Sequence, residues 1–484
     1  MRNTNLDLLL YDTLTRRKRS VGTVSFGGGS DIINYYSCGP TVYHYAHLGN
    51  MRAYLFNDIL VRVLRVIDYK VNYVMNITDV GHLTDDGDDG EDKLEVGANR
   101  ENRTVLEVSE MYTEAFKEDI DILNIASPDI MCKATDNIAE QLSMIKTLEK
   151  KGYTYVISSG VYFDTSKIED YTALSGVKLE EQMDGKRVSV LDKKTASDFC
   201  LWRFNEGITS NRSMSWSSPW GNGVPGWHIE CSAMGHKYCK EGISIHTGGE
   251  DHIAVHHTNE RAQNIGCYGG DWGVKMWVHN AHMMMGEKKM SKSSGDIIRP
   301  SDLDELGIHP LSFRLLTLQS HYRKQMKFSI ELLKVADKLY KKLRHKISTE
   351  LEFYPSKLKL DLDHEDIYKE RFLEPILSDL NTAKGLSFLI ELSKNLDRYS
   401  KKTASIIVSR IEEIFQLDLF KIIDDNDLNL SSIPIDVLKL IDSRKVAKEN
   451  GDYKEADVIR NRLSLLGYKI TDTSSGQKVQ KITI

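Results

Sequence analysis

This sequence has few cysteines, no long apolar stretch and no large excess of either charge, and each of these features argues against a class of protein. Six cysteines among 484 residues are too few for a disulfide-built scaffold, so we expect a reducing, cytoplasmic compartment. No apolar run approaches the roughly 18 residues that span a bilayer, and the N-terminal segment lacks the apolar core of a signal peptide. The 64 basic and 70 acidic side chains argue against a protein that binds nucleic acid by overall charge alone.

The composition and length indicate a folded protein of several domains. Apolar residues make up 40% and charged residues 28% of the chain, which is ordinary for a globular protein and excludes a mainly disordered one. At roughly 150 residues per domain, this length predicts about three domains.

Strand and helix patterns alternate in the first third of the chain. Residues 32–36 form a β-branched and aromatic run, residues 54–64 carry apolar side chains at helical spacing, and residues 71–77 form a second strand-like run. This β-α-β unit favours a parallel sheet in an α/β fold. Residues 104–123 and 136–150 are predicted amphipathic helices.

The predicted secondary structure changes at two places in the rest of the chain. Residues 151–225 are rich in turns and short strands, as expected of an insertion between two halves of a sheet. Apolar periodicity then predicts helices at 310–319, 329–345, 364–380, 383–395 and 403–415. Residues 438–484 are predicted to form two helices and a strand at 468–470.

The charge also changes near the C-terminal end. Residues 361–443 carry 17 acidic and 10 basic side chains, whereas residues 444–484 carry 5 acidic and 9 basic ones. A basic end behind an acidic helical region suits contact with a phosphate backbone, although a lysine-rich end more often only aids solubility.

Two unusual stretches leave alternatives open. Residues 79–92 hold six Asp and one Glu, but the spacing does not fit a calcium-binding loop, so a solvated loop is the favoured interpretation. All six Trp lie between residues 202 and 277, four of them within 202–227. They predict either a rigid pocket wall or a tryptophan-rich corner of the core, and composition does not separate the two.

Two motifs suit the binding of phosphate. His47-Leu48-Gly49-Asn50 follows the first predicted strand and opens the next helix, whose N-terminus attracts anions, although helix capping alone explains such a motif in most proteins. Lys289-Met290-Ser291-Lys292-Ser293-Ser294-Gly295 is more specific. Its two lysines, spaced three apart beside hydroxyls and a glycine, predict a cationic loop that stabilises charge on a leaving pyrophosphate.

Metal ligation is a further hypothesis. The candidates are Cys38, Cys231, His256, His257 and Glu260. His256 and Glu260 lie four apart, hence on one face of a helix, and a mixed set of sulfur, imidazole and carboxylate suits zinc. Each residue alone has an ordinary structural explanation as a buried or hydrogen-bonded side chain. The other cysteines, which show no ligand spacing, are expected to be inert: Cys132, Cys200, Cys239 and Cys267.

Together these motifs resemble cysteinyl-tRNA synthetase, a family of class I aminoacyl-tRNA synthetases, over essentially the whole chain. YSCGPTVY at 36–43 resembles the family's opening motif, and His47–Asn50 its HIGH element. PGWHIECSAM at 225–234 is the most specific match, and Lys289–Ser293 is the KMSKS loop unchanged. Further similar segments are 76–79, beside the amino-acid pocket, and 246–260.

The resemblance implies a fold and a domain order. A Rossmann-like α/β catalytic domain with a parallel sheet would occupy residues 1–122 and 225–285, split by an inserted connective domain at 123–224. A KMSKS loop and stem-contact region at 286–345, an α-helical bundle tRNA-binding domain at 346–437 and a small C-terminal α+β anticodon-binding domain at 438–484 would follow.

The resemblance also implies how cysteine would be selected. Cys38, Cys231, His256 and Glu260 would bind one zinc ion per chain, and Thr78 and Trp227 would line the cysteine pocket. An apolar pocket separates cysteine from serine or alanine by only about 10- to 200-fold. A metal–thiolate bond discriminates more strongly, so we expect the insertion at 123–224 to be structural and not an editing domain.

The implied activity is the ATP-dependent ligation of L-cysteine to its tRNA through a cysteinyl-adenylate. ATP, with magnesium, would contact the residues His47, Asn50, Gly249, Asp251 and Lys292. The residues taking part in catalysis would be His47, Asn50, Lys289 and Lys292. A monomer is expected.

The sequence departs from the family pattern at four places that do not remove a proposed ligand. The acidic loop after Asp79 differs from the commonest pattern, and three motif positions hold other residues. Asn50 stands where the HIGH element ends in histidine, Thr258 stands where the usual HHENE has glutamate, and Thr247 starts the usual glycine run. Two alternatives to the synthetase remain. One is a cysteine-adenylating ligase that passes cysteine to a small amine, which would leave residues 346–484 unexplained. The other is a non-catalytic RNA-binding paralogue, which would be expected to lack a ligand or loop lysine.

Overall fold

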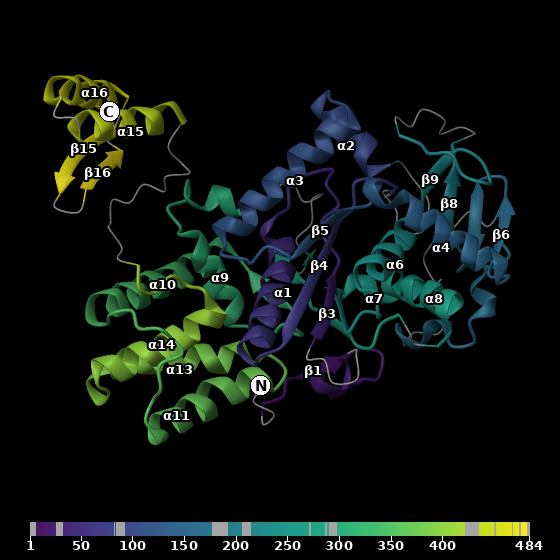
Figure 1. Ribbon diagram of the computed structural model, residues 1–484, viewed down its shortest axis with the longest axis horizontal. Coiled ribbons are helices and arrows are strands. Elements are labelled where there is room, and N and C mark those ends of the chain that lie inside the picture. Colours follow the sequence, from purple (N-terminus) through teal and green to yellow (C-terminus); the bar gives the residue numbers. More distant parts are fainter. Residues whose placement is uncertain are drawn as a thin grey trace. The chain divides into compact units, whose positions relative to one another are not determined.

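The computed structural model shows an α/β core with a helical region beside it (Figure 1). The residues that it describes are 6–25, 32–81, 83, 92–176, 192–205, 214–270, 273–285, 288–289, 298–421, 435–449, 452–466, 468–473 and 476–481. The chain divides into two compact units. Unit 1 comprises residues 1–341 and 354–417, and unit 2 comprises residues 342–353 and 418–484.

A five-stranded parallel sheet forms the centre of unit 1. Its spatial order is β11-β10-β3-β4-β5, and every neighbouring pair is parallel. The strands are β3 (Ile32–Ser37), β4 (Lys70–Ile77), β5 (Ile130–Lys133), β10 (Ile245–Gly249) and β11 (Trp277–Asn280). This is the Rossmann-like order, whose switch point between β3 and β10 is where such sheets bind ligands at the carboxyl ends of the strands. The predicted parallel sheet is confirmed.

Helix α1 (Leu48–Val66) connects β3 to β4, as the apolar spacing predicted. Its buried face includes Leu55, Leu60 and Leu64, and the helix packs against β4 and β10. Helix α2 (Lys93–Glu101) and helix α3 (Val105–Ile122) follow. Thr104 caps α3 together with Glu107 in a capping box, which confirms the helix predicted at 104–123.

One predicted boundary is wrong. The insertion was expected to begin at residue 123, but β5 lies inside that range and pairs with β4 in the central sheet. Strand β5 has only four residues, too short a run for its apolar pattern to be distinguished from a loop. The inserted part therefore begins after β5, with helix α4 (Ile138–Lys150).

The inserted part contains an antiparallel sheet in the order β6-β7-β8-β9. Its strands are Thr154–Ile157, Gly160–Phe163, Phe199–Phe204 and Gly223–Pro225. Trp202 is fully buried in the core beneath this sheet, with Trp216 and Trp220 packed against it. Trp227, by contrast, lines a cavity. Both interpretations of the tryptophan-rich stretch are therefore correct for different residues.

Two helices on the second half of the sheet carry polar side chains inward. Helix α6 (Trp227–Tyr238) packs against helix α8 (His256–Tyr268), and the short α7 (Asp251–Ala254) precedes α8. Smaller strands are β1 (Leu9–Asp12), β2 (Arg17–Ser20), β12 (Met283–Met285), β13 (Lys288–Lys289) and β14 (Met326–Phe328).

The helices predicted beyond residue 310 are confirmed. They are α9 (Pro310–Leu318), α10 (Ile330–Glu350), α11 (Leu362–Tyr368), α12 (Glu374–Leu377), α13 (Thr382–Lys394) and α14 (Lys401–Phe415). The helix predicted at 364–380 is interrupted by a π-helical turn at Lys369–Leu373 and ends before Asp379 and Leu380, which both have positive φ. Helices α9 and α14 pack against α1.

Unit 2 has a small core of its own. Helices α15 (Ile435–Glu449) and α16 (Tyr453–Leu465) precede a hairpin of β15 (Tyr468–Thr473) and β16 (Gly476–Lys481). Val437, Ile459, Leu463, Tyr468 and Ile470 are buried together. The sequence did not predict β16, because its six residues hold a single valine among polar side chains and glycine. Across the described ranges, no helix combines the length and apolar character needed to cross a membrane.

Candidate functional site

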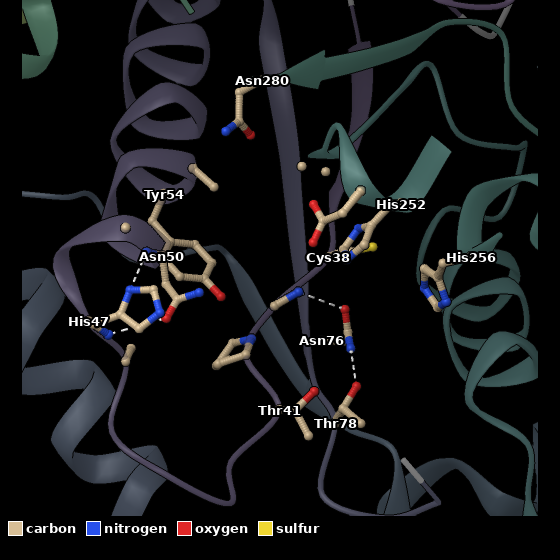
Figure 2. A pocket seen from close by; sticks show the side chains of 18 of the residues that line it. Cys38, Thr41, His47, Asn50, Tyr54, Asn76, Thr78, His252, His256 and Asn280 are labelled. Carbon is tan, nitrogen blue, oxygen red and sulfur yellow. Dashed lines mark hydrogen bonds between the residues drawn. The ribbon is translucent and has the colours of Figure 1, made fainter. Parts of the chain in front are cut away.

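A cavity of about 520 Å³ opens at the carboxyl ends of β3 and β10. This volume lies within the roughly 300–1,000 Å³ range of ligand pockets. Figure 2 shows His47 and Asn50 on one side of it, with Cys38, His252 and His256 on the other. The structure thus brings together nine of the predicted site residues as lining groups: Cys38, His47, Asn50, Thr78, Trp227, Cys231, Gly249, Asp251 and His256.

Helix α1 presents hydrogen-bond donors to this cavity. The His47 Nδ1 atom accepts a bond from the Asn50 backbone N at 3.2 Å, so a neutral His47 ring carries its proton on Nε2. The Asn50 Oδ1 atom accepts from the His47 backbone N at 3.2 Å, which leaves the amide nitrogen of Asn50 as the donor end. The capping box therefore orients two donors, the His47 Nε2 atom and the Asn50 amide nitrogen, at a helix N-terminus. Asn50 thus supplies a donor at the position where the HIGH element usually has a histidine.

Four predicted ligands converge on the other side of the cavity. Cys38 follows β3, Cys231 lies on α6, and His256 and Glu260 lie on α8. Their ligand atoms all lie within 4.8 Å of one another. Gly39 helps to position Cys38, because a Cβ at this residue would lie 1.6 Å from the Asn76 carbonyl oxygen. Only glycine permits so close an approach between the two chain segments.

Two neighbouring histidines hydrogen-bond the outer atoms of this cluster, which are the ring nitrogen of His256 and the carboxylate oxygen of Glu260 that face away from the other ligands. The His228 Nδ1 atom bonds His256 Nδ1 at 2.9 Å, and His246 Nε2 bonds Glu260 Oε2 at 3.0 Å. The inner atoms, His256 Nε2 and Glu260 Oε1, lie 3.1 Å apart and are buried without a hydrogen-bond partner. Buried polar atoms rarely stay unpaired. Together with two sulfur atoms they form a donor set that fits a divalent metal ion, and mixed sulfur, nitrogen and oxygen ligands exclude a calcium-type site.

The charges in the cluster favour ligation. Burial raises the pKa of Glu260, but the charges of His246 and His256 outweigh it and lower that pKa to about 2. Burial likewise raises the pKa of Cys38, yet a hydrogen bond from Cys231 and the charge of His257 bring it well below its ordinary value. The hydrogen bond to Cys38, together with burial, raises the pKa of Cys231. These shifts favour a carboxylate at Glu260 and a thiolate at Cys38 even before a cation contributes.

A second combination, Cys38, His246, His257 and Glu260, also places its ligand atoms within 4.8 Å. Its histidines are already hydrogen-bonded: His257 Nε2 contacts the Cys38 sulfur at 3.2 Å, and His257 Nδ1 bonds His279 Nε2 at 2.7 Å. Because both ring nitrogens of His257 already have partners, whereas the His256 Nε2 atom is buried without a hydrogen-bond partner, the geometry favours the predicted set over the set that contains His257.

A buried polar chain supports the wall next to the cluster. Asn76 Oδ1 accepts from the Gly39 backbone N at 3.0 Å, and Asn76 Nδ2 donates to Thr78 Oγ1 at 3.1 Å. Thr78 in turn donates to Glu230 Oε2 at 3.1 Å. Burial raises the pKa of Glu230 well above its ordinary value. The sequence had assigned no role to Glu230, His228 or His246, although the three-residue step from His228 to Cys231 on α6 could have indicated that their side chains share a face.

Some predicted features lie outside the described residues. Lys289 is described only by its backbone in β13, and Lys292 lies outside, as does most of the acidic stretch 79–92. The cysteines predicted to be inert are buried and take part in no disulfide within the described residues. Burial raises the pKa of Cys132, Cys239 and Cys267 to about 12 each, so all three are protonated at neutral pH.

The supporting histidines give a first prediction. Replacing His246 with Phe keeps a ring beside Trp277 but removes the bond to Glu260. We expect the metal affinity of the protein to fall by about 10- to 100-fold, as is usual when a ligand loses its hydrogen-bond partner. Competition with a chelator measures this affinity. His236→Phe, a histidine of α6 stacked on Tyr268 at 4.5 Å, is the matched control, and an equal loss in both variants would contradict the assignment.

Comparison with known proteins agrees with this site. The model of the class I (C) tRNA synthetase catalytic domain family matches residues 28–338. A solved structure of Mycobacterium tuberculosis methionyl-tRNA synthetase with methionyl-adenylate shares the fold, with a TM-score of 0.54 and 13% identity over 80% of this chain and 90% of that one. Fold and site therefore define a class I aminoacyl-tRNA synthetase.

Full-length relatives narrow the class to one family. Cysteine--tRNA ligase of Treponema denticola is 40% identical over 99% of this chain and 100% of its own length. Cysteine--tRNA ligase 1 of Burkholderia lata is 40% identical over 98% of this chain and 97% of its own. The chain belongs to the cysteine--tRNA ligase family.

Proposed function

We propose that this chain ligates L-cysteine to its tRNA with ATP, through a cysteinyl-adenylate. One observation carries the proposal: a sulfur-rich metal-ligand cluster and the donor-bearing N-terminus of α1 line the same cavity. The first suits a thiol and the second an anion, so one cavity fits both cysteine and the phosphates of ATP.

Cysteine selection is assigned to the four clustered residues, Cys38, Cys231, His256 and Glu260. A single zinc ion held by them would supply a soft acceptor for the substrate thiolate, which a serine hydroxyl matches poorly. Thr78 and Trp227, which line the cavity near the cluster, are proposed to contact the amino acid. Because His246 and His228 hold the outer atoms of Glu260 and His256, the inner atoms stay aimed at one point.

ATP binding is assigned to the opposite side of the cavity. His47 and Asn50 would donate to phosphate oxygens, and Gly249 and Asp251, at the end of β10 and start of α7, would contact the nucleoside part. Lys289 and Lys292 would stabilise charge on the departing pyrophosphate, with magnesium bound to the nucleotide.

The reaction then has two displacement steps. A carboxylate oxygen of cysteine attacks the α-phosphorus of ATP, and pyrophosphate leaves. A ribose hydroxyl of the terminal adenosine of tRNA attacks the activated carbonyl, and AMP leaves. No protein nucleophile is needed, because holding the groups in line and stabilising charge supply most of the rate.

The domain roles are also proposals. Residues 1–122 and 225–285 would be the catalytic domain, now together with β5, and the rest of 123–224 a structural insertion. Residues 286–345 would contact the acceptor stem, 346–437 the body of the tRNA, and 438–484 the anticodon. We also propose that the active species is a monomer, working in the cytoplasm with its tRNA.

A variant that lacks residues 438–484 is expected to keep cysteine activation but to lose most of its tRNA charging. Unit 2 has its own core, and the cavity lies entirely in unit 1, so cysteine-dependent ATP–pyrophosphate exchange should stay within about twofold of wild type. Charging of tRNA should fall by at least about tenfold, equivalent to about 1.4 kcal/mol of lost binding. Both rates are measured on the same preparation, and undiminished charging would show that the C-terminal residues have another role.

A charging assay with purified protein, tRNA and each amino acid in turn tests the proposal as a whole. We expect cysteine alone to be activated and transferred. The alternative, a ligase that passes cysteine to a small amine, would show cysteine-dependent exchange without transfer to tRNA. It leaves residues 346–484 without a role, and the relatives match through that region as well.

A further inference from the structure

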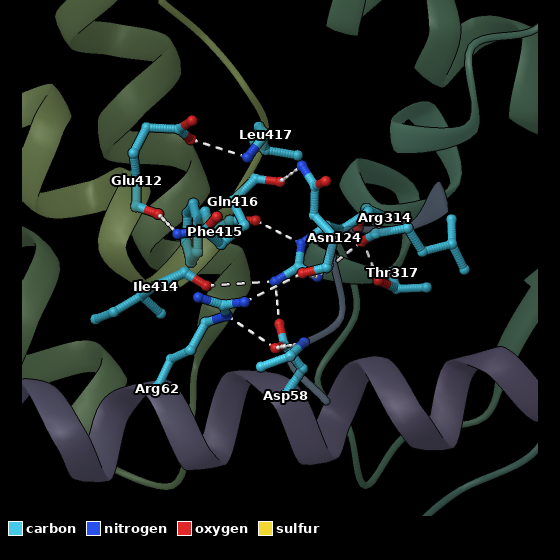
Figure 3. A network of polar contacts seen from close by, with 12 residues as sticks. Asp58, Arg62, Asn124, Arg314, Thr317, Glu412, Ile414, Phe415, Gln416 and Leu417 are labelled. Atoms are coloured by element: carbon cyan, nitrogen blue, oxygen red, sulfur yellow. Dashed lines mark hydrogen bonds and ion pairs between the residues drawn. The ribbon is translucent and has the colours of Figure 1, made fainter. Parts of the chain in front are cut away.

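The last residues of unit 1 are held by an unusual set of side chains. Helix α14 ends at Phe415, and Leu417 is the final residue before the chain enters unit 2. Figure 3 shows this end of α14 facing Arg314 and Asn124, with α1 beneath them. The segment is far from the cysteine pocket in sequence, and none of its residues lines the cavity.

Four consecutive carbonyl groups of this segment accept side-chain hydrogen bonds. Arg314 donates to Ile414 O at 3.5 Å and to Phe415 O at 2.6 Å. Asn124 Nδ2 donates to Gln416 O at 3.2 Å, and Tyr340 Oη donates to Leu417 O at 3.1 Å. The donors come from α9, from the turn after α3 and from α10. We call Asn124, Arg314 and Tyr340 the exit clamp.

These bonds go beyond what the helix end requires. Gln416 adopts the left-handed conformation with φ 48° and returns a backbone bond from its N to Glu412 O at 3.1 Å, which is a common way to end a helix. The Leu417 backbone N bonds the Glu412 carboxylate at 3.0 Å. Since the helix is already terminated locally, the donors from three other elements serve to fix where the chain leaves unit 1.

Arg314 ties this exit to the helix of the active site. Its side chain is fully buried, and it also donates to the carbonyls of Leu123 and Asn124 at 3.0 and 3.2 Å. The same guanidinium pairs with the buried carboxylate of Asp58 on α1, whose first turn carries Asn50 and whose N-cap is His47. A planar guanidinium with five donors suits this task, and a cation is favourable at the C-terminal ends of α3 and α14.

We propose that the exit clamp is a positioning device for tRNA charging: it fixes the start of the segment leading to residues 438–484 relative to α1 and the cavity. The inference rests on the proposed function, in which those residues read the anticodon. Arg314, Asn124 and Tyr340 are positioning residues, because none of them lines the cavity. Loosening the clamp leaves cysteine activation intact and weakens the link between anticodon recognition and charging.

The test compares cognate tRNA with a tRNA altered in its anticodon. Arg314→Gln removes the guanidinium that makes two of the four exit hydrogen bonds, while Asp58 keeps its bonds from Arg62 at 2.8 Å and the Ala126 backbone N at 2.8 Å. We expect cysteine-dependent pyrophosphate exchange within about twofold of wild type, and a fall of about fivefold or more in the ratio of kcat/KM for cognate over altered tRNA. Arg314→Lys should recover part of that ratio.

The control is Arg410→Gln on α14, the helix whose end the clamp holds. Arg410 also donates to carbonyls, those of Ser356 at 2.9 Å and Leu358 at 3.1 Å, but not at the exit, so its ratio should stay at the wild-type value. If Arg314→Gln does not fold, the double variant Asn124→Gly and Tyr340→Phe removes two exit donors without leaving a buried charge. Asn124 has φ 53°, a conformation that glycine tolerates.

The outcomes separate the two proposals. An unchanged ratio in the clamp variants, or equal losses of exchange and charging, would overturn the positioning role while leaving the proposed function intact. A wild-type protein that does not discriminate between the two tRNAs would overturn the proposed anticodon role, and the clamp proposal with it. A wild-type protein without cysteine-dependent exchange would overturn the proposed function itself.

Discussion

Cys231→Ser is expected to abolish stoichiometric metal binding and to lower cysteine activation by more than about 100-fold, beyond the usual cost of losing a residue that only hydrogen-bonds a ligand. A serine hydroxyl stays protonated at neutral pH and is a poor partner for a soft or borderline ion. Without the metal ion, the Glu260 carboxylate would stay buried with less positive charge nearby to offset the cost of its burial. Elemental mass spectrometry measures the metal, and pyrophosphate exchange measures activation.

Cys239→Ser provides the matched control. Cys239 ends the same helix and is fully buried, and burial raises its pKa to about 12, yet it lies outside the ligand cluster. Its replacement should leave the metal content at one ion per chain. Full metal content in Cys231→Ser, or equal loss in both variants, would refute the assignment of Cys231.

Lys292→Ala is expected to lower kcat for adenylate formation by about 10²- to 10³-fold, the usual loss when one donor to developing charge is removed. The charge that this lysine would stabilise appears only as pyrophosphate leaves, so KM for cysteine should change by less than about threefold. Pre-steady-state exchange kinetics separate the two quantities. Replacement of the exposed Lys240 by Ala is the control, and an equal loss in rate and in cysteine binding would argue against a transition-state role.

Motifs with a fixed spacing allowed most of the site to be predicted. His256 and Glu260 share a face at helical spacing, and α8 indeed brings their inner atoms to 3.1 Å. The opening of α1 at His47 followed from a strand, a turn and apolar periodicity in succession. By contrast, the pairing of Cys38 with Cys231 depends on how β3 and α6 pack, which no local pattern contains. The resemblance to a family supplied that link before the structure did.

Other features could not be predicted because they depend on tertiary contacts alone. His228 and His246 acquire their roles only from hydrogen bonds to His256 and Glu260. Strand β5 is too short for its pattern to separate it from a loop, so the boundary of the insertion was set too early. Arg314, an arginine within an apolar helix, gave no sign that its guanidinium would reach the end of another helix about a hundred residues later.

X-ray absorption at the zinc edge tests most directly the claim that this site recognises sulfur. Without substrate, zinc should have two sulfur neighbours, those of Cys38 and Cys231, at about 2.3 Å. Saturating cysteine should raise that number to three, whereas the same concentration of serine should leave it at two. A sulfur count that stays at two with cysteine bound would contradict the account.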